Sequence, residues 1–175
     1  MGQFINIKNN GLISIKCKHF QLNCNKTNIH EKYCKHKEPD TDGAEDGSVQ
    51  EWEGHTFAVF HSNTYNFDSF QTECIARGGH LAIIDSAEKD AFLYSLFRSL
   101  GFNSAYFGLY RDNQNVWRWV DGTRAVYTNW APGEPSNGSE RWGMYYYRFT
   151  NGKWNDGNIN PNIYHDGYYI CEWDY

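Results

Sequence analysis

Residues 128–156, TNWAPGEPSNGSERWGMYYYRFTNGKWND, are the most informative stretch of this chain. Polar segments rich in Gly, Asn and Pro flank a short aromatic run, a pattern typical of strands joined by loops. The polar segments contain three acids, Glu134, Glu140 and Asp156, beside hydroxyl and amide side chains. Oxygen donors of these kinds suit a hard cation with many ligands, which indicates calcium rather than zinc. A solvated polar loop is the alternative on acid count alone.

Pro135 lies between two of the candidate ligands. Peptide bonds before proline adopt the cis form far more often than other peptide bonds. A cis bond here would direct the side chains of Glu134 and Ser136 to one point. We therefore expect this loop to gather its oxygen donors rather than spread them.

The residues before this stretch predict two helices. Asn66 can cap a helix with apolar residues at helical spacing that ends at Gly78. Asp85 with Glu88 three residues later resembles a capping box, and the apolar face of the helix that follows ends at Gly101. Short strands are expected over residues 54–60, 106–109, 116–120, 143–149 and 168–173. Helices that precede strands, without alternation of the two, predict an α+β fold.

Charge divides the chain into three parts. Residues 1–37 contain seven Lys and one acid, whereas Glu38 to Glu53 contains seven acids and no Lys or Arg. We predict a basic N-terminal segment over 1–37, an acidic flexible linker over 38–51 and a folded domain over 52–175. The net charge of -5 argues against nucleic acid as a partner. No apolar stretch is long enough for membrane insertion, and no signal peptide is visible.

The five cysteines fall into two groups. Cys74 lies on the apolar face of the first predicted helix and Cys171 lies in the last predicted strand. They would tie the two ends of the domain together as a disulfide, or else be two separately buried thiols. The other three cysteines lie among histidines in the basic segment, where zinc is one reading and a single disulfide with a spare thiol is the other. The zinc ligands would be Cys17, Cys24, Cys34 and His36.

Trp52 to Trp173 resembles a C-type lectin domain over nearly its whole length. The resemblance implies a fold closed by its first and last strands, two flanking helices and a long calcium-binding loop region. It also implies the Cys74–Cys171 disulfide. The motifs that carry it occur in the family's order: Gly79-His-Leu-Ala, Tyr106-Phe-Gly-Leu109, Trp117-Arg-Trp119-Val-Asp-Gly122, Thr128-Asn-Trp130, Glu134-Pro-Ser136, Trp154-Asn-Asp156 and Ile170-Cys-Glu-Trp173.

The resemblance assigns one calcium site to the long loop and the strand after it. Two neighbouring hydroxyls of a monosaccharide would coordinate this calcium, while the same acids and amides hydrogen-bond the sugar. Trp142 or another aromatic of the loop could stack on a galactose-type ring, whereas Glu134 favours a mannose-type sugar. The sugar class is therefore open. The calcium and sugar ligands carried over are Glu134, Ser136, Glu140, Asn155 and Asp156.

The chain departs from the family pattern at several positions. Ser136 replaces the usual Asn, so one short hydroxyl replaces an amide, and calcium affinity should fall. Trp142 and Ile159 stand where many members have a second disulfide, which together with the Gly79 to Glu88 run resembles microbial members. The auxiliary calcium site also lacks its expected acids, so one calcium is expected in the whole domain rather than two or three. The residues at the auxiliary positions are Gln114, Asn137 and Arg141.

These observations favour a calcium-dependent carbohydrate-binding protein, a lectin of the kind used in adhesion and glycan recognition. The alternative is a domain of the same fold that binds protein and has a vestigial calcium site, because fold alone does not decide function. An enzyme is not expected, because acids that bind calcium have lowered pKa values and are poor general acids. The resemblance places the protein outside the cell or on its surface, where oligomers would add avidity. Asn25 and Asn137 begin glycosylation sequons and are taken as unmodified.

Overall fold

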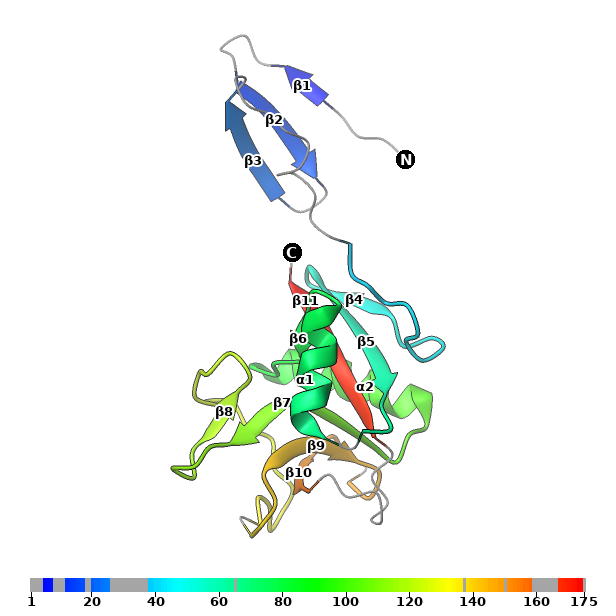
Figure 1. Ribbon diagram of the computed structural model, residues 1–175, viewed down its shortest axis with the longest axis vertical. Coiled ribbons are helices and arrows are strands. Elements are labelled where there is room, and N and C mark those ends of the chain that lie inside the picture. The colour runs from blue at the N-terminus through cyan, green and yellow to red at the C-terminus, as the bar shows by residue number, and fades with distance from the viewer. Residues whose placement is uncertain are drawn as a thin grey trace. The chain divides into compact units, whose positions relative to one another are not determined.

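The computed structural model describes residues 5–7, 12–17, 20–25, 38–64, 66–136, 138–149, 151–158 and 167–174. It divides the chain into two compact units, Met1–Glu38 with Tyr175, and Pro39–Asp174. The first unit contains an antiparallel sheet that the sequence patterns did not indicate (Figure 1). Its strands, in the order β1-β2-β3, are β1 (Ile5–Ile7), β2 (Leu12–Cys17) and β3 (Phe20–Asn25).

The second unit is built on a mixed sheet of eight strands (Figure 1). Six strands follow the order β10-β9-β7-β11-β5-β4, and β6 and β8 pair with β11 and β7. The first and last long strands, β5 and β11, pair antiparallel over their full length. The strands are β4 (Gln50–Trp52), β5 (His55–His61), β6 (His80–Leu81), β7 (Ser104–Arg111), β8 (Trp117–Trp119), β9 (Trp142–Tyr146), β10 (Trp154–Gly157) and β11 (Tyr168–Asp174).

Two helices accompany this sheet, α1 (Phe67–Ala76) and α2 (Ala87–Leu100). Asn66 caps α1 as predicted, because its side chain accepts a hydrogen bond from Asp68 N–H at 2.9 Å. The cap of α2 is Ser86, whose Oγ accepts from Lys89 N–H at 3.2 Å. The predicted cap at Asp85 was therefore wrong by one residue. The α+β class itself is confirmed.

Each helix covers one face of the sheet. Side chains alternate along β11, so Ile170 joins the core cluster with α2, while its neighbours Tyr169 and Cys171 join the cluster with α1. A Cβ added at Gly108 would lie 2.7 Å from the carbonyl oxygen of Leu81, which explains why this strand carries Gly at its centre. The chain thus encloses two aromatic-rich cores separated by one sheet.

The predicted disulfide is present. Cys74 in α1 and Cys171 in β11 are joined, with 5.5 Å between their Cα atoms and a sequence separation of 97. Cross-linking a loop of this length removes unfolded-state entropy worth roughly 4–5 kcal/mol. The bond thus fastens the first helix to the last strand.

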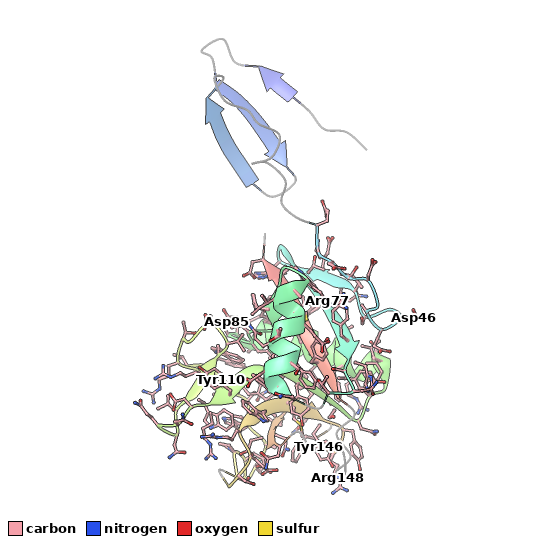
Figure 2. All side chains as sticks on the ribbon, viewed as in Figure 1. Asp46, Arg77, Asp85, Tyr110, Tyr146 and Arg148 are labelled. Atoms are coloured by element: carbon pink, nitrogen blue, oxygen red, sulfur yellow. A yellow bond between two sulfur atoms is a disulfide. The ribbon has the colours of Figure 1, made fainter. Side chains whose placement is uncertain are left out.

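Much of the acidic segment expected to be a linker packs on the second unit. Glu45 N–H donates to the carbonyl of Val59 at 2.8 Å, and the fully buried Ser48 accepts from Val59 N–H at 3.1 Å. Arg77, labelled in Figure 2, donates to the carbonyl of Asp42 at 2.6 Å. The segment therefore lies against β5, and the domain boundaries at residues 37 and 51 stay predictions.

Candidate functional site

A long loop between β8 and β9 carries three of the predicted site residues. Within the loop, Ala131 N–H donates a hydrogen bond to the carbonyl oxygen of Trp154 in β10 at 2.9 Å. The end of the loop is pinned to the same strand, where Arg141 N–H donates to the carbonyl of Gly157 at 3.2 Å. The peptide bond before Pro135 is cis, the form that the sequence left open. The loop and the strand with the Trp-Asn-Asp motif therefore form one structural group.

Ser136 is at the centre of this group. Its backbone N–H donates to Oδ1 of Asp156 at 2.8 Å, and its hydroxyl donates to Oε2 of Glu140 at 2.5 Å. The side-chain amide of Asn155 donates to the carbonyl oxygen of Asp156 at 2.6 Å. The structure thus brings Ser136 and Glu140 of the loop together with Asp156 of β10, whereas the contact of Asn155 is only to its neighbour in the strand.

Three carboxylates, those of Glu134, Glu140 and Asp156, lie in this group. Asp156 is fully buried, and Oε2 of Glu134 is buried without a hydrogen-bond partner among the described residues. Burial, followed by the side chain of Asp156 and the charge of Glu140, raises the pKa of Glu134 to about 7. Burial and the charge of Glu140 also raise the pKa of Tyr106. Excess negative charge is therefore concentrated here.

This arrangement fits a calcium ion. Three carboxylates, a hydroxyl and an amide supply only oxygen ligands, which is the donor set that calcium prefers. A dication would partner the orphaned oxygen of Glu134 and offset the repulsion among the acids. The residues that could hold it are Glu134, Ser136, Glu140, Asn155 and Asp156.

Trp142 does not join this group. Its ring stacks on Phe67 of α1, with the ring centroids 4.4 Å apart and an angle of 10° between the planes. The half-buried indole packs against the core cluster beneath α1. One face of this ring is thus covered by protein, which leaves that face unable to stack on a sugar. The other position of the missing second disulfide, Ile159, lies outside the described residues.

Sequence reasoning missed Asp90, which holds the strand that carries the Trp-Asn-Asp motif. This buried side chain in α2 accepts hydrogen bonds from Trp154 Nε1 at 2.9 Å and Tyr145 Oη at 2.5 Å. Its other oxygen accepts from Tyr127 Oη at 2.8 Å and Asn129 Nδ2 at 2.6 Å. Asp90 therefore fixes the tryptophan that precedes the two β10 ligands. An acid on the apolar side of a predicted helix was the available signal.

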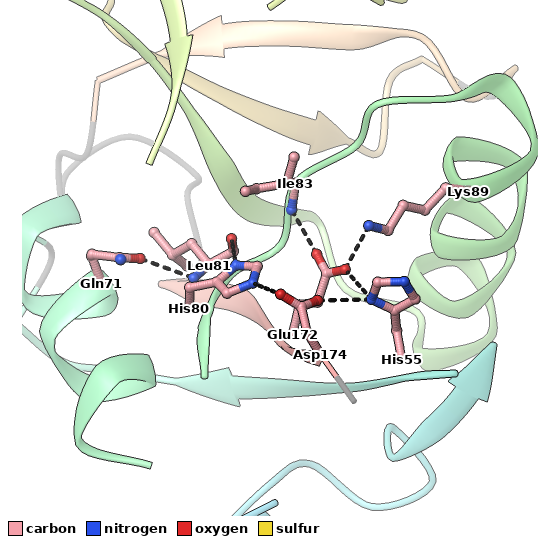
Figure 3. Close-up of polar contacts among 8 residues, drawn as sticks. All are labelled: His55, Gln71, His80, Leu81, Ile83, Lys89, Glu172 and Asp174. Atoms are coloured by element: carbon pink, nitrogen blue, oxygen red, sulfur yellow. Dashed lines mark hydrogen bonds and ion pairs between the residues drawn. The ribbon is translucent and has the colours of Figure 1, made fainter. Parts of the chain in front are cut away.

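A second cluster of ionisable groups lies where β5, β6 and β11 meet (Figure 3). Nδ1 of His55 lies 2.9 Å from Glu172 and 2.8 Å from Asp174, close enough for these three residues to hold a metal. However, the carboxylate of Glu172 also accepts hydrogen bonds from Lys89 Nζ at 2.5 Å and from Ile83 N–H at 2.9 Å. Because the protein supplies these donors itself, we interpret this cluster as a structural network.

The candidate zinc ligands of the N-terminal segment are not placed by the structure. Cys17 and Cys24 belong to β2 and β3, but their side chains are outside the description. Cys34 and His36 are outside the described residues. The same is true of Asn137, whereas Asn25 ends β3. Zinc in this segment stays a prediction.

The described residues thus form an α+β domain with an oxygen-rich loop. The chain belongs to the family described as "Lectin C-type domain", whose model matches residues 63–173. This match confirms the predicted family, and with it the expectation that the domain is not an enzyme. Neither of the helices in the described part of the chain could cross a bilayer.

Several curated relatives and solved structures are similar to the chain. A "Hepatic lectin" of Gallus gallus is 33% identical over 133 residues, which cover 74% of this chain and 60% of the relative. The "C-type lectin domain family 4 member A" of Mus musculus is 34% identical over 99 residues, or 54% of this chain and 40% of the relative. The chain thus spans less than two thirds of either relative.

Among solved structures, human lithostathine matches with a TM-score of 0.63 at 16% identity, covering 74% of this chain and 98% of that protein. The complex of SPL-1 with GlcNAc matches with a TM-score of 0.61 at 22% identity, covering 74% and 94%. At these identities the likeness establishes the fold, which is the one expected from the sequence.

Proposed function

We propose that this domain is a lectin that binds glycans through one calcium ion. The observation that carries the proposal is the convergence of Glu134, Glu140 and Asp156 around Ser136, with a buried oxygen of Glu134 left without a partner. Calcium would supply the positive charge that the protein does not. Vicinal sugar hydroxyls would complete its coordination, with the acids as hydrogen-bond acceptors.

We propose a mannose-type rather than a galactose-type sugar. Glu134 occupies the position at which the family's mannose-type pattern carries Glu. The argument for galactose relied on an aromatic ring such as Trp142 in the sugar site, and that ring packs on Phe67 instead. Two proteins of similar fold were solved with saccharides of this kind: SPL-1 in complex with GlcNAc, and cow CD23 in the presence of a GlcNAc2Man3 oligosaccharide. They support this class of ligand.

Glycan binding is tested on the full chain with a panel of immobilised glycans, probed in calcium and again in chelator. We expect signal on mannose- and GlcNAc-terminated glycans that disappears with chelator. Calorimetry with calcium alone should give a single site in the lectin domain. Signal confined to galactose-terminated glycans would contradict the sugar class, and signal that persists in chelator would contradict the calcium mechanism.

A second candidate is a protein-binding domain with a weakened calcium site. The observation that favours it is the hydroxyl of Ser136, which is short and already donates to Glu140. No calcium binding at millimolar concentration, together with no glycan signal, would favour this function over the first.

The disulfide between Cys74 and Cys171 is stable in an oxidising compartment. We therefore propose that the protein works outside the cell or on its surface. A single shallow sugar site binds weakly, so we also propose that several copies act together. Size-exclusion chromatography with light scattering on the full chain tests this; a monomer at all concentrations would contradict it.

A further inference from the structure

Two arginines connect the long loop to the turn that follows β7. Arg111, the last residue of β7, is 7% exposed, and its guanidinium donates to the carbonyl of Gly138 at 2.6 Å. Arg141, at the end of the loop, donates in the opposite direction, to Oδ1 of Asn113 at 3.2 Å. The backbone joins the same pair, since Arg111 N–H donates to the carbonyl of Arg141 at 2.9 Å. We call Arg111 and Arg141 the arginine clamp.

The turn that receives Arg141 is itself well fixed. Oδ1 of Asp112 accepts from the N–H groups of Gln114 at 2.8 Å and Val116 at 2.9 Å. Its other oxygen accepts from Arg118 Nε at 2.6 Å. The hydrogen bond from Val116, followed by that from Arg118, lowers the pKa of Asp112 and keeps it ionised. The arginine clamp therefore fastens the loop to a rigid support.

The clamp acts on the segment between two candidate ligands. Gly138 lies two residues after Ser136 and two residues before Glu140, so Arg111 holds the stretch that positions both. A guanidinium group also carries a permanent positive charge and a fixed fork of donors. It therefore supplies positive charge that would otherwise have to come from a calcium ion. By the family resemblance, Arg141 also stands at a position where the auxiliary calcium site would carry an acid.

We propose that the arginine clamp holds the long loop in its binding conformation without calcium, as an internal substitute for a second cation. Arg111 and Arg141 are positioning residues, because they act on the ligands through the loop. Only the effect on calcium affinity rests on the proposed function; the order of the loop itself does not. The clamp predicts a loop that is already formed before the first calcium ion binds.

Two effects of Arg111 on calcium binding have opposite signs. Its positive charge repels calcium, so loss of the charge alone would strengthen binding. Its hydrogen bond keeps the loop formed, so loss of the clamp would weaken binding by the fraction of molecules whose loop is open. A variant that keeps the charge but loses the fork of donors, Arg111→Lys, therefore isolates the positioning role from the electrostatic one.

The first test measures hydrogen–deuterium exchange of the full chain in chelator. Peptides that cover residues 131–141 should exchange slowly in the wild type and at least tenfold faster in Arg111→Met, which keeps the side-chain volume but loses the donors. Arg111→Lys, with the charge but no fork, should lie between them. Peptides from β5 report whether each variant is folded. Arg124→Gln, on an exposed arginine of the β8 hairpin, is the matched control and should behave as wild type.

The second test titrates calcium into the same proteins by calorimetry. If about a tenth of the Arg111→Met molecules have a formed loop, Kd rises about tenfold. A Kd in Arg111→Lys, which keeps the charge, no higher than in the wild type would overturn the clamp, and so would fast exchange of the loop in wild-type protein in chelator. If the wild type binds no calcium, the proposed function fails, and the exchange experiment still decides whether the clamp holds the loop.

Discussion

Two glutamates of the same domain, the fully buried Glu172 and the half-buried Glu134, have opposite surroundings. Glu172, in the last strand, receives Lys89 Nζ, the N–H of Ile83 and the imidazole of His55 (Figure 3). Glu134, in the long loop, faces Asp156 and Glu140 instead, and one of its oxygens has no partner among the described residues. The first carboxylate has its countercharge built into the fold, whereas the second does not.

The difference shows how the same residue type becomes structural in one place and functional in another. A buried carboxylate must be matched by donors or a cation, because desolvation otherwise penalises its charge. At Glu172 the match comes from the chain, so nothing is left for a ligand. At Glu134 the match must come from solution, which is the condition for a metal-binding site.

The largest effect is expected from Lys89→Met, which removes the countercharge of Glu172. Removal of the ammonium leaves Glu172 buried without its cation, and the free energy of unfolding should fall by about 3–5 kcal/mol. Urea denaturation measures it. The double variant Lys89→Met with Glu172→Gln should recover most of the loss, whereas Arg98→Met, on an exposed position of α2, should stay within about 0.5 kcal/mol. A loss below 1 kcal/mol in the single variant would contradict the matched network.

The next largest effect is expected from Asp156→Asn, in the loop site that contains Glu134. The amide keeps an acceptor for Ser136 N–H but removes a charged calcium ligand. Calcium Kd measured by calorimetry should rise at least about 100-fold, equivalent to about 2.7 kcal/mol, while the fold persists. Asp121→Asn, an exposed acid in the β8 turn, is the control. Unchanged calcium binding by Asp156→Asn would remove this residue from the site.

The smallest effect has the opposite sign to the first. In chelator at pH 8, Glu134→Gln should raise the free energy of unfolding by about 1 kcal/mol after allowance for solvent screening, because it removes a repelled charge. The raised pKa of about 7, against an ordinary 4.5, means that the penalty grows as pH rises through this interval. Near pH 5 wild type and variant should therefore converge.

Urea denaturation of both proteins at the two pH values makes this measurement. A Glu134→Gln variant that is less stable than wild type at pH 8 would show that Glu134 is matched within the fold, as Glu172 is. The comparison between the two glutamates would then fail, and with it the main argument for a cation in the loop.

The sequence predicted the backbone and the order of the motifs well. Asn66, the glycines that follow each helix, and the alternating strands act over a few residues, so their patterns can be read locally. The Cys74–Cys171 disulfide was one of two readings until the family resemblance favoured it. The Glu134–Pro135 loop and the Trp-Asn-Asp motif likewise indicated the candidate site, whose ligand assignment stays a prediction.

Side-chain partners were a different matter. Lys89 and Glu172 are 83 residues apart, and Asp90 binds Trp154 across 64 residues, so no local pattern indicates either pair. Trp142 was predicted in the sugar site, yet it packs on Phe67. The sequence by itself determined the family, both helices, five of the strands and the candidate ligands, because these depend on residue types at short spacing; it did not indicate β1–β4, β6 or β10. Only tertiary structure decided which charges are matched, because a countercharge depends on segments that meet through packing.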